Sequence, residues 1–255
     1  MGTSSRTASE ALYDGLARAA PLRGTDLRAR FGRLIRNSLG VRPSRTAASK
    51  KVISYRQRFV YLGIPKVSSS SFAIFLTTEV DKEARVLQGD LEEITREHKE
   101  IFDYFTFAFV RSPWARVASC YRDKICGQGT TRFTTATFEG LRRGMPFAEF
   151  VEWLHAAPEG RDEAADRHWM SQHRFLRNEV LPSPAFVGKL EHLRRDLESL
   201  RRRFGWRVWR FPHLNRTDAV AHENARPYRA LYDARLMALV AERYRVDIEL
   251  FDYDF

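Results

Sequence analysis

Two short segments of this sequence combine a cation with hydroxyl groups, and each directly follows an apolar run. Residues 65–71 read Pro-Lys-Val-Ser-Ser-Ser-Ser, and residues 111–119 begin with Arg-Ser-Pro. Lysine offers a compact charge to a phosphate, arginine can grip one through two parallel hydrogen bonds, and serine hydroxyls add further donors. Both segments are therefore predicted to bind phosphate-like anions.

The elements that would position these segments can be predicted from the same stretches. The run 59–64 is β-prone and ends at Pro65, and an apolar helical stretch begins at Phe72. The run 105–110 is continuously apolar, as in a strand buried in a parallel sheet. Ser112 and Pro113 then supply an N-cap and a first-turn proline for a helix to about residue 125. Ligands of open α/β sheets bind at the carboxyl ends of strands, where both segments fall.

The rest of the chain continues the alternation of helices and strands. Residues 127–145 are rich in Gly and Thr and are predicted to form a loop. Helices are predicted at 147–155, 164–176, 194–204 and 228–244, and further strands at 185–190 and 207–211. This order predicts an α/β sandwich around a mostly parallel sheet.

The N-terminal arm, residues 1–51, carries most of the net charge of +11. It holds eleven Lys and Arg against three Asp and Glu, and residues 24–39 form an amphipathic pattern that ends at Gly40. Such a helix either docks on the main domain or lies on a membrane surface or acidic polymer. With a linker at 41–51, the main domain is predicted to span 52–255.

Several classes of protein are disfavoured by the composition. No run approaches the roughly 20 apolar residues of a membrane-spanning helix. Cys120 and Cys126 fall on different faces of the predicted helix, which argues against a disulfide, and no metal-ligand spacing is present. These features predict a cytoplasmic protein without a metal, with membrane association as a further option. The glycines of a Walker phosphate loop are missing, which disfavours an ordinary P-loop ATPase.

The two segments together resemble those of a known family. The lysine segment resembles the 5'-phosphosulfate loop of sulfotransferases that use 3'-phosphoadenosine-5'-phosphosulfate (PAPS), and Arg111 with Ser119 resembles their 3'-phosphate motif. The likeness extends in particular to carbohydrate sulfotransferases of the chondroitin and dermatan type and their bacterial relatives. It continues through His168-Trp169, the run 186–191 leading to Asp196, and the ending 247–253, and so covers about 58–255. It implies a P-loop-NTPase-like, three-layer sulfotransferase fold.

The resemblance also implies a reaction, in which a sulfuryl group moves from PAPS to a hydroxyl of a carbohydrate or other acceptor without a metal. Lys66 would stabilise the charge that develops on the bridging oxygen. The residues implied in donor binding are Lys66, Val67, Ser68, Ser69, Ser70, Ser71, Arg111 and Ser119. Ser68 stands where the family commonly has glycine, so either Ser68 accepts an unfavourable conformation or the loop differs.

The acceptor side of the site is less defined by the sequence. A general base is needed, and His168 and His98 are the candidates, with His173 and Glu79 as further options. Trp169 could stack on a sugar ring, and Arg122 could contact the acceptor.

Two rival functions remain open at this point. One is a nucleotide-dependent kinase with a related phosphate loop, and the other is a non-catalytic binder of acidic polymer through the basic arm. No nucleic-acid partner is expected for the enzyme itself.

Overall fold

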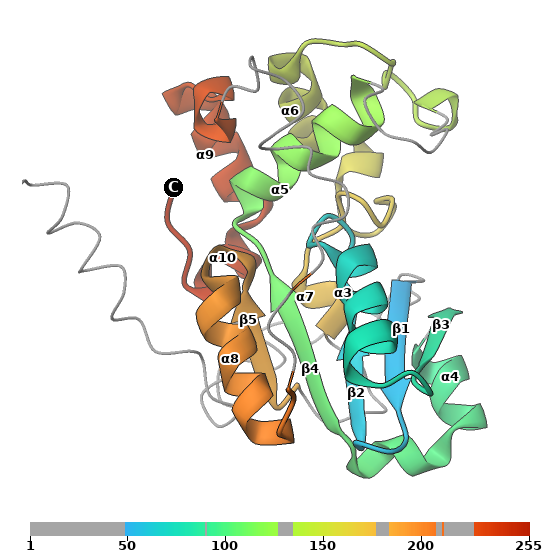
Figure 1. The fold of residues 1–255 in the computed structure, drawn as a ribbon. Coiled ribbons are helices and arrows are strands. Elements are labelled where there is room, and N and C mark those ends of the chain that lie inside the picture. The colour runs from blue at the N-terminus through green and yellow to red at the C-terminus, as the bar shows by residue number, and fades with distance from the viewer. Residues whose placement is uncertain (1–48, 90, 127–134, 177–183, 208–210, 212–226) are drawn as a thin grey trace, which may run out of the picture.

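The centre of the molecule is a five-stranded sheet in the order β3-β1-β2-β4-β5 (Figure 1). The computed structural model describes residues 49–89, 91–126, 135–176, 184–207, 211 and 227–255. The strands are β1 (Ser49–Ser54), β2 (Phe59–Leu62), β3 (Arg85–Gly89), β4 (Phe105–Val110) and β5 (Phe186–Lys189). The three strands expected at 59–64, 105–110 and 185–190 are thus confirmed, whereas β1 and β3 were not predicted.

The sheet is mixed, which corrects the prediction of a mostly parallel one. Strands β2, β4 and β5 pair in parallel, but β1 pairs antiparallel with both β2 and β3. The hairpin that joins β1 to β2 turns at residues 55–58, where Arg58 has a φ of 55°. Residues 49–51, expected in the linker, are the first residues of β1. A tight hairpin permits only antiparallel pairing, so β1 departs from the strand–helix–strand pattern.

From β2 onward, each strand is followed by at least one helix. They are α3 (Ser69–Phe75), α4 (Leu91–Glu97), α5 (Pro113–Cys120), α6 (Phe147–Ala156), α7 (His173–Leu176), α8 (Leu193–Phe204), α9 (Ala234–Arg243) and α10 (Arg245–Phe251). Two π-helical turns, η1 (Leu76–Val80) and η3 (Tyr121–Ile125), extend α3 and α5. In Figure 1, α3 and α8 lie over one face of the sheet, and α5, α6 and α9 gather beyond the end of β4 where α5 begins.

Aromatic side chains fix α3 on the sheet. Phe72 of α3 stacks on Phe109 of β4 with ring centroids 4.4 Å apart, and it meets Tyr61 of β2 at 5.1 Å. All three residues are fully buried. A buried aromatic contributes about 2–3 kcal/mol through its burial, and favourable ring pairs add to this. The carboxyl ends of β2 and β4 are therefore held firmly against the helix that follows the lysine segment.

Two predicted helices differ from the observed ones. Of residues 164–176, only α7 is helical, because Asp162 and Asp166 accept the backbone N–H groups of Ser171 and His168 and so favour turns. The expected closing helix 228–244 is divided into η7 (Tyr228–Leu231) and α9. Asp233 caps α9 by accepting the N–H of Leu236 at 2.7 Å, which sets a new helix start.

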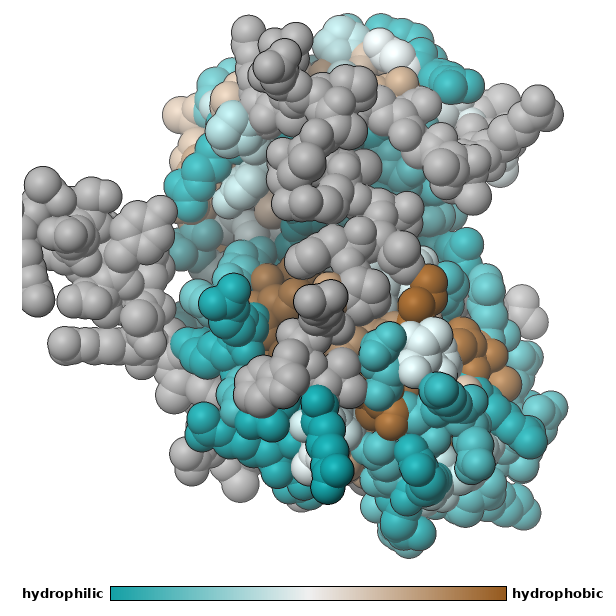
Figure 2. Space-filling view, in the orientation of Figure 1, coloured by the Kyte–Doolittle hydropathy of each residue, from teal (hydrophilic) through white to brown (hydrophobic). Residues whose placement is uncertain are grey.

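Some of the predicted elements fall on residues that the structure does not describe. The amphipathic helix at 24–39, most of the strand at 207–211 and the first half of the loop 127–145 lie outside the described residues. Within the described part, no helix is long and apolar enough to cross a membrane. Figure 2 shows a mostly hydrophilic described surface on this face, with hydrophobic patches across the middle where α3 lies.

Candidate functional site

The lysine segment forms a tight turn between β2 and α3. Its backbone turns back on itself where the N–H of Val67 donates to the carbonyl of Ile64 at 3.2 Å. Lys66 and Ser68 both have positive φ values, 68° and 51°. Ser68 therefore takes the left-handed conformation that glycine adopts more easily. Of the two alternatives raised by the missing glycine, the unfavourable conformation at Ser68 is the one observed.

The Lys66 side chain lies in a small cluster of charges. Its ammonium is 2.9 Å from Oδ2 of Asp123, and the ammonium of Lys124 is 3.1 Å from the same oxygen. Burial alone would raise the pKa of Asp123, but the hydrogen bonds and charges of the two lysines outweigh it and hold this pKa below its usual value. Asp123 is thus a carboxylate, and it holds Lys66 at the carboxyl edge of the sheet.

Asp123 lies on a π-helical turn, and the sequence analysis missed it because its contact with Lys66 joins residues 57 positions apart. The N–H of Cys126 donates to the carbonyl of Tyr121 at 3.0 Å, five residues back, so the turn holds one residue more than an α-helical turn. Arg122 lies half-buried on this turn, next to Asp123. Such π-turns occur often at functional sites. Cys120 and Cys126 are both free, as predicted.

The arginine segment is held by side chains from distant parts of the chain. Gln172 accepts the backbone N–H of Arg111 at 2.9 Å and donates to the Arg111 carbonyl at 2.8 Å. Glu191 accepts the backbone N–H of Ser112 at 2.7 Å. Ser112 occupies the N-cap position of α5, as expected, but its side chain forms no capping hydrogen bond. Ser119, seven positions further, is buried in α5.

The two segments meet in the structure. The Arg111 side chain donates from Nη1 to the carbonyl of Lys66 at 3.4 Å. Arg116, a buried residue of α5, donates to the carbonyl of Pro65 at 3.0 Å and to that of Met170 at 2.7 Å. A guanidinium has five N–H donors and can hold several carbonyls at once. Arg116 therefore ties the lysine segment to the stretch that carries His168.

His168 forms a pair with Asp166 that suits a general base. Its Nδ1 is 2.5 Å from Oδ1 of Asp166. Burial lowers the pKa of His168 below 6.5, and although Asp166 acts to raise it, the charges of Lys124 and Arg167 add to the lowering. With Nδ1–H directed at the carboxylate, the basic lone pair of the neutral ring is on Nε2. The spacing Asp-x-His is a local signal that the sequence analysis did not use.

The charged groups of both clusters also act on the thiol of Cys120 in α5. Burial raises the pKa of this thiol to about 12, and the charges of Lys66, Arg116, Asp166 and Asp123 all act on it. Electrostatic effects of this kind require that the charges lie close to the thiol. The lysine cluster and the carboxylate of the His168 pair therefore both lie near the same residue of α5.

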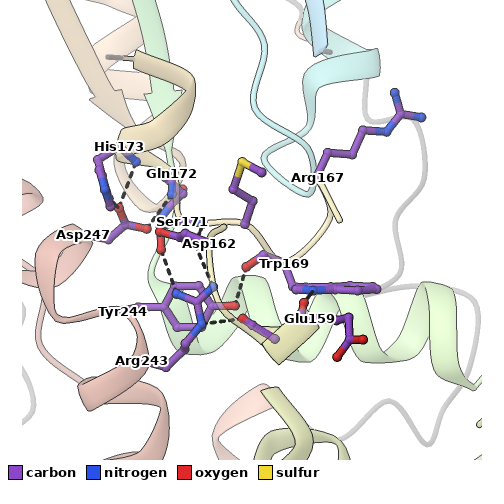
Figure 3. Close-up of polar contacts among 12 residues, drawn as sticks. Glu159, Asp162, Arg167, Trp169, Ser171, Gln172, His173, Arg243, Tyr244 and Asp247 are labelled. Carbon is purple, nitrogen blue, oxygen red and sulfur yellow. Dashed lines mark hydrogen bonds and ion pairs between the residues drawn. The ribbon is translucent and has the colours of Figure 1, made fainter. Parts of the chain in front are cut away.

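The stretch 159–173 is fixed by the two C-terminal helices, as Figure 3 shows. Arg243 of α9 donates to Asp162 at 2.7 Å and to the Ser171 hydroxyl at 3.1 Å. Asp247 of α10, fully buried, accepts the backbone N–H groups of Gln172 and His173 at 2.7 and 2.9 Å. In the same view Arg167 points away from this network. The C-terminal helices thus position the residues that hold Arg111 and carry His168.

Two of the other candidate bases, His98 and Glu79, lie in less suitable places. His98 precedes β4, and its Nδ1 is 2.8 Å from the hydroxyl of Tyr55, which follows β1. Both therefore lie at the amino end of β4. Its carboxyl end is about 20 Å away, because a strand rises roughly 3.3 Å per residue. Glu79 is exposed on η1. His173 forms a pair like that of His168, with its Nδ1 2.8 Å from Oδ1 of the buried Asp247, so it stays a second candidate base.

The expected role of Trp169 does not fit its position. The side chain is 1% exposed, and its ring packs against Phe138 and Trp153 with centroids 4.9 and 5.5 Å apart. Its Nε1–H donates to the carbonyl of Glu159 at 2.9 Å. A sugar has no access to this ring face, so Trp169 is a core residue that anchors the neighbouring His168. Within the residues that the structure describes, no group of His, Cys, Asp and Glu could hold a metal ion.

Comparison with known proteins identifies the class. The chain matches the sulfotransferase family over residues 50–254 and belongs to this family. The match begins at the second residue of β1, which agrees with the observed start of the sheet.

The relatives that it matches are carbohydrate sulfotransferases. Carbohydrate sulfotransferase 11 of Rattus norvegicus is 28% identical over 166 residues, which cover 59% of this chain and 47% of that protein. Carbohydrate sulfotransferase 14 of Danio rerio is 23% identical over 244 residues, covering 85% of this chain and 65% of that protein. The chain thus spans about half the length of the first of these relatives and two thirds of the second. No solved structure matches the sequence significantly.

Proposed function

We propose that this protein is a sulfotransferase that moves a sulfuryl group from PAPS to a hydroxyl of a carbohydrate or glycoconjugate. The observation that supports it most is the meeting of the two predicted phosphate segments, with Arg111 bonded to the carbonyl of Lys66 at 3.4 Å. Family membership supports the sulfuryl transfer, and the names of the relatives support a carbohydrate acceptor. The parallel strands β2, β4 and β5 suit the three-layer, P-loop-NTPase-like fold that the resemblance implies.

In this proposal the lysine segment binds the sulfuryl end of the donor and the arginine segment binds its 3'-phosphate. The donor supplies an activated sulfuryl group, whose bond to the bridging phosphate oxygen breaks as the acceptor oxygen bonds to sulfur. Lys66 stabilises the negative charge that grows on that oxygen, together with the hydroxyls of residues 68–71. Arg111 and Ser119 bind the 3'-phosphate. Nε2 of His168 accepts the proton of the acceptor hydroxyl, and Asp166 holds the ring in the required tautomer.

Calorimetric titration with 3',5'-adenosine bisphosphate, the desulfated product, tests the donor assignment. We expect the wild-type protein to bind it, and Lys66→Ala and Arg111→Ala each to weaken binding while the far-UV circular dichroism stays unchanged. We also expect Lys66→Ala to lower kcat for sulfate transfer from labelled PAPS by about 10²–10³-fold, as for loss of other preorganised charge-stabilising donors. Unchanged binding and transfer in both variants would remove the site assignment.

The cellular setting is also a proposal. We infer a cytoplasmic enzyme that reaches a membrane surface through residues 24–39, because the arm combines an apolar face with arginines. Deleting residues 1–48 should then abolish flotation with anionic liposomes but leave the bisphosphate affinity intact. Flotation that persists without the arm contradicts this part of the proposal.

A further inference from the structure

Lys50 lies beside the lysine segment although it is remote in sequence. It is the second residue of β1, and its carbonyl accepts the backbone N–H of Gly63 at 2.8 Å, just past the end of β2. This contact needs a glycine, because a Cβ at position 63 would lie 2.5 Å from the Lys50 carbonyl oxygen. The close approach places Lys50 at the carboxyl edge of β2, where the donor segment begins.

The Lys50 side chain points toward the serines of that segment. Successive side chains of a strand point to opposite faces of the sheet. Lys51 is buried on one face, where its ammonium donates to the carbonyl of Gly89 at 2.6 Å. Lys50 is on the face of α3, and its ammonium donates to the Ser70 hydroxyl at 3.0 Å. Of these two adjacent lysines, only Lys50 faces the donor segment.

Among the described residues, the charge of Lys50 is not balanced by a carboxylate. No Asp or Glu among the described residues forms an ion pair with it, whereas the charge of Lys66 is paired with Asp123. An ammonium has three N–H donors, and the bond to Ser70 uses one of them. A hydroxyl that accepts a bond from a cation is also polarised, which makes it a better donor to a third group. Lys50 and Ser70 together thus present N–H and O–H donors to an anion.

From this geometry, and given the proposed function, we propose that Lys50 is a second lysine of the donor site and binds the 5'-phosphate of the nucleotide together with Ser70. Lys66 acts on the oxygen between phosphorus and sulfur, whereas Lys50 reaches the same phosphate from the β1 side. Its role is to bind and position the donor. The family resemblance did not indicate this residue, because it precedes the stretch on which the resemblance rests.

The test compares Lys50→Met with Lys82→Met, a matched substitution at an exposed lysine after η1. Methionine keeps the length and apolar stem of lysine but removes the charge. The probes for calorimetry are 3',5'-adenosine bisphosphate, adenosine 5'-phosphate and adenosine 3'-phosphate. We expect Lys50→Met to weaken binding of the first two by about 10-fold or more, the usual loss for one hydrogen bond to a charged group. Binding of the 3'-phosphate should not change, and Lys82→Met should bind all three like the wild type.

A further variant tests the partnership with Ser70. If the two residues share one phosphate, the double variant with Ser70→Ala should lose less affinity than the product of the two single losses. Unchanged affinity of Lys50→Met for the bisphosphate overturns the proposal. So does an equal loss for both monophosphates, because a purely structural tie between β1 and α3 would not distinguish them. If the wild-type protein itself does not bind the bisphosphate, the proposed function fails and this inference fails with it.

Discussion

Replacing Ser68 by glycine should stabilise the protein, although glycine usually destabilises. Ser68 has φ 51° and ψ 28°, a left-handed conformation that costs an L-residue about 1–2 kcal/mol. Glycine relieves this cost but loses about 0.5–1 kcal/mol through its greater freedom in the unfolded chain. The net gain in the free energy of unfolding is therefore about 0.5–1 kcal/mol. For a domain of this size it corresponds to a rise in Tm of about 1–4 °C.

The neighbouring serine provides the matched control. Ser69 is the first residue of α3 with helical geometry, so Ser69→Gly should lower the free energy of unfolding by about 0.5 kcal/mol. Ser68→Ala removes the hydroxyl but keeps the Cβ, and it should bring no gain. Urea titration followed by circular dichroism measures all three variants. If Ser68→Gly destabilises as much as Ser69→Gly, the left-handed conformation at residue 68 carries no strain and the reasoning is wrong.

Three further perturbations test the arrangement around the two segments. Asp123→Asn should tighten binding of adenosine bisphosphate about fivefold. The phosphate then no longer competes with the Asp123 carboxylate for Lys66, and the lost ion pair is worth about 1 kcal/mol. Weaker binding of the variant in calorimetry would contradict this. Gln172→Ala should lower the free energy of unfolding by about 2–3 kcal/mol, because two hydrogen bonds to the backbone of Arg111 are lost. It should also weaken bisphosphate binding. An unchanged free energy of unfolding in urea titration would contradict this. Burial holds the pKa of His168 below 6.5, so the acid limb of kcat/KM, which reports the free enzyme, should have its midpoint below pH 6.5 and should be lost in His168→Gln. A midpoint above pH 6.5 would exclude His168 as the base.

The sequence predicted the strand–loop–helix units well because their signals are local. The apolar run 105–110 coincides with β4, and Pro113 begins α5 as expected. Strand β1 was missed because it begins Ser-Lys-Lys, which reads as a polar linker. Strand β3 was missed because it is a largely exposed edge strand without an apolar run. Both lie on the antiparallel side of the sheet, but only β3 is largely exposed, whereas all residues of β1 except Lys50 are buried.

Of the candidate site, only the two segments proposed to bind anions were predictable. Lys66 and Arg111 could be found because each follows a buried strand at a recognisable spacing. Gln172 could not, since its contact with Arg111 joins residues 61 positions apart and an isolated glutamine carries no pattern. Asp123 could not be found either, since its contact with Lys66 joins residues 57 positions apart. Local patterns thus predict which groups bind anions, but not which groups orient them.

The orientation of the site depends on a separate set of contacts. The relative position of the two segments comes from the sheet, because β2 and β4 are adjacent and parallel and their carboxyl ends meet at one edge. The turn at Arg111 and the stretch carrying His168 are instead held by Gln172, which Asp247 of α10 fixes in turn. Asp247 is fully buried, so this support requires that α10 be docked. The C-terminal helices therefore couple the candidate base to the candidate 3'-phosphate site, and a change that loosens α10 should affect donor binding and proton transfer together.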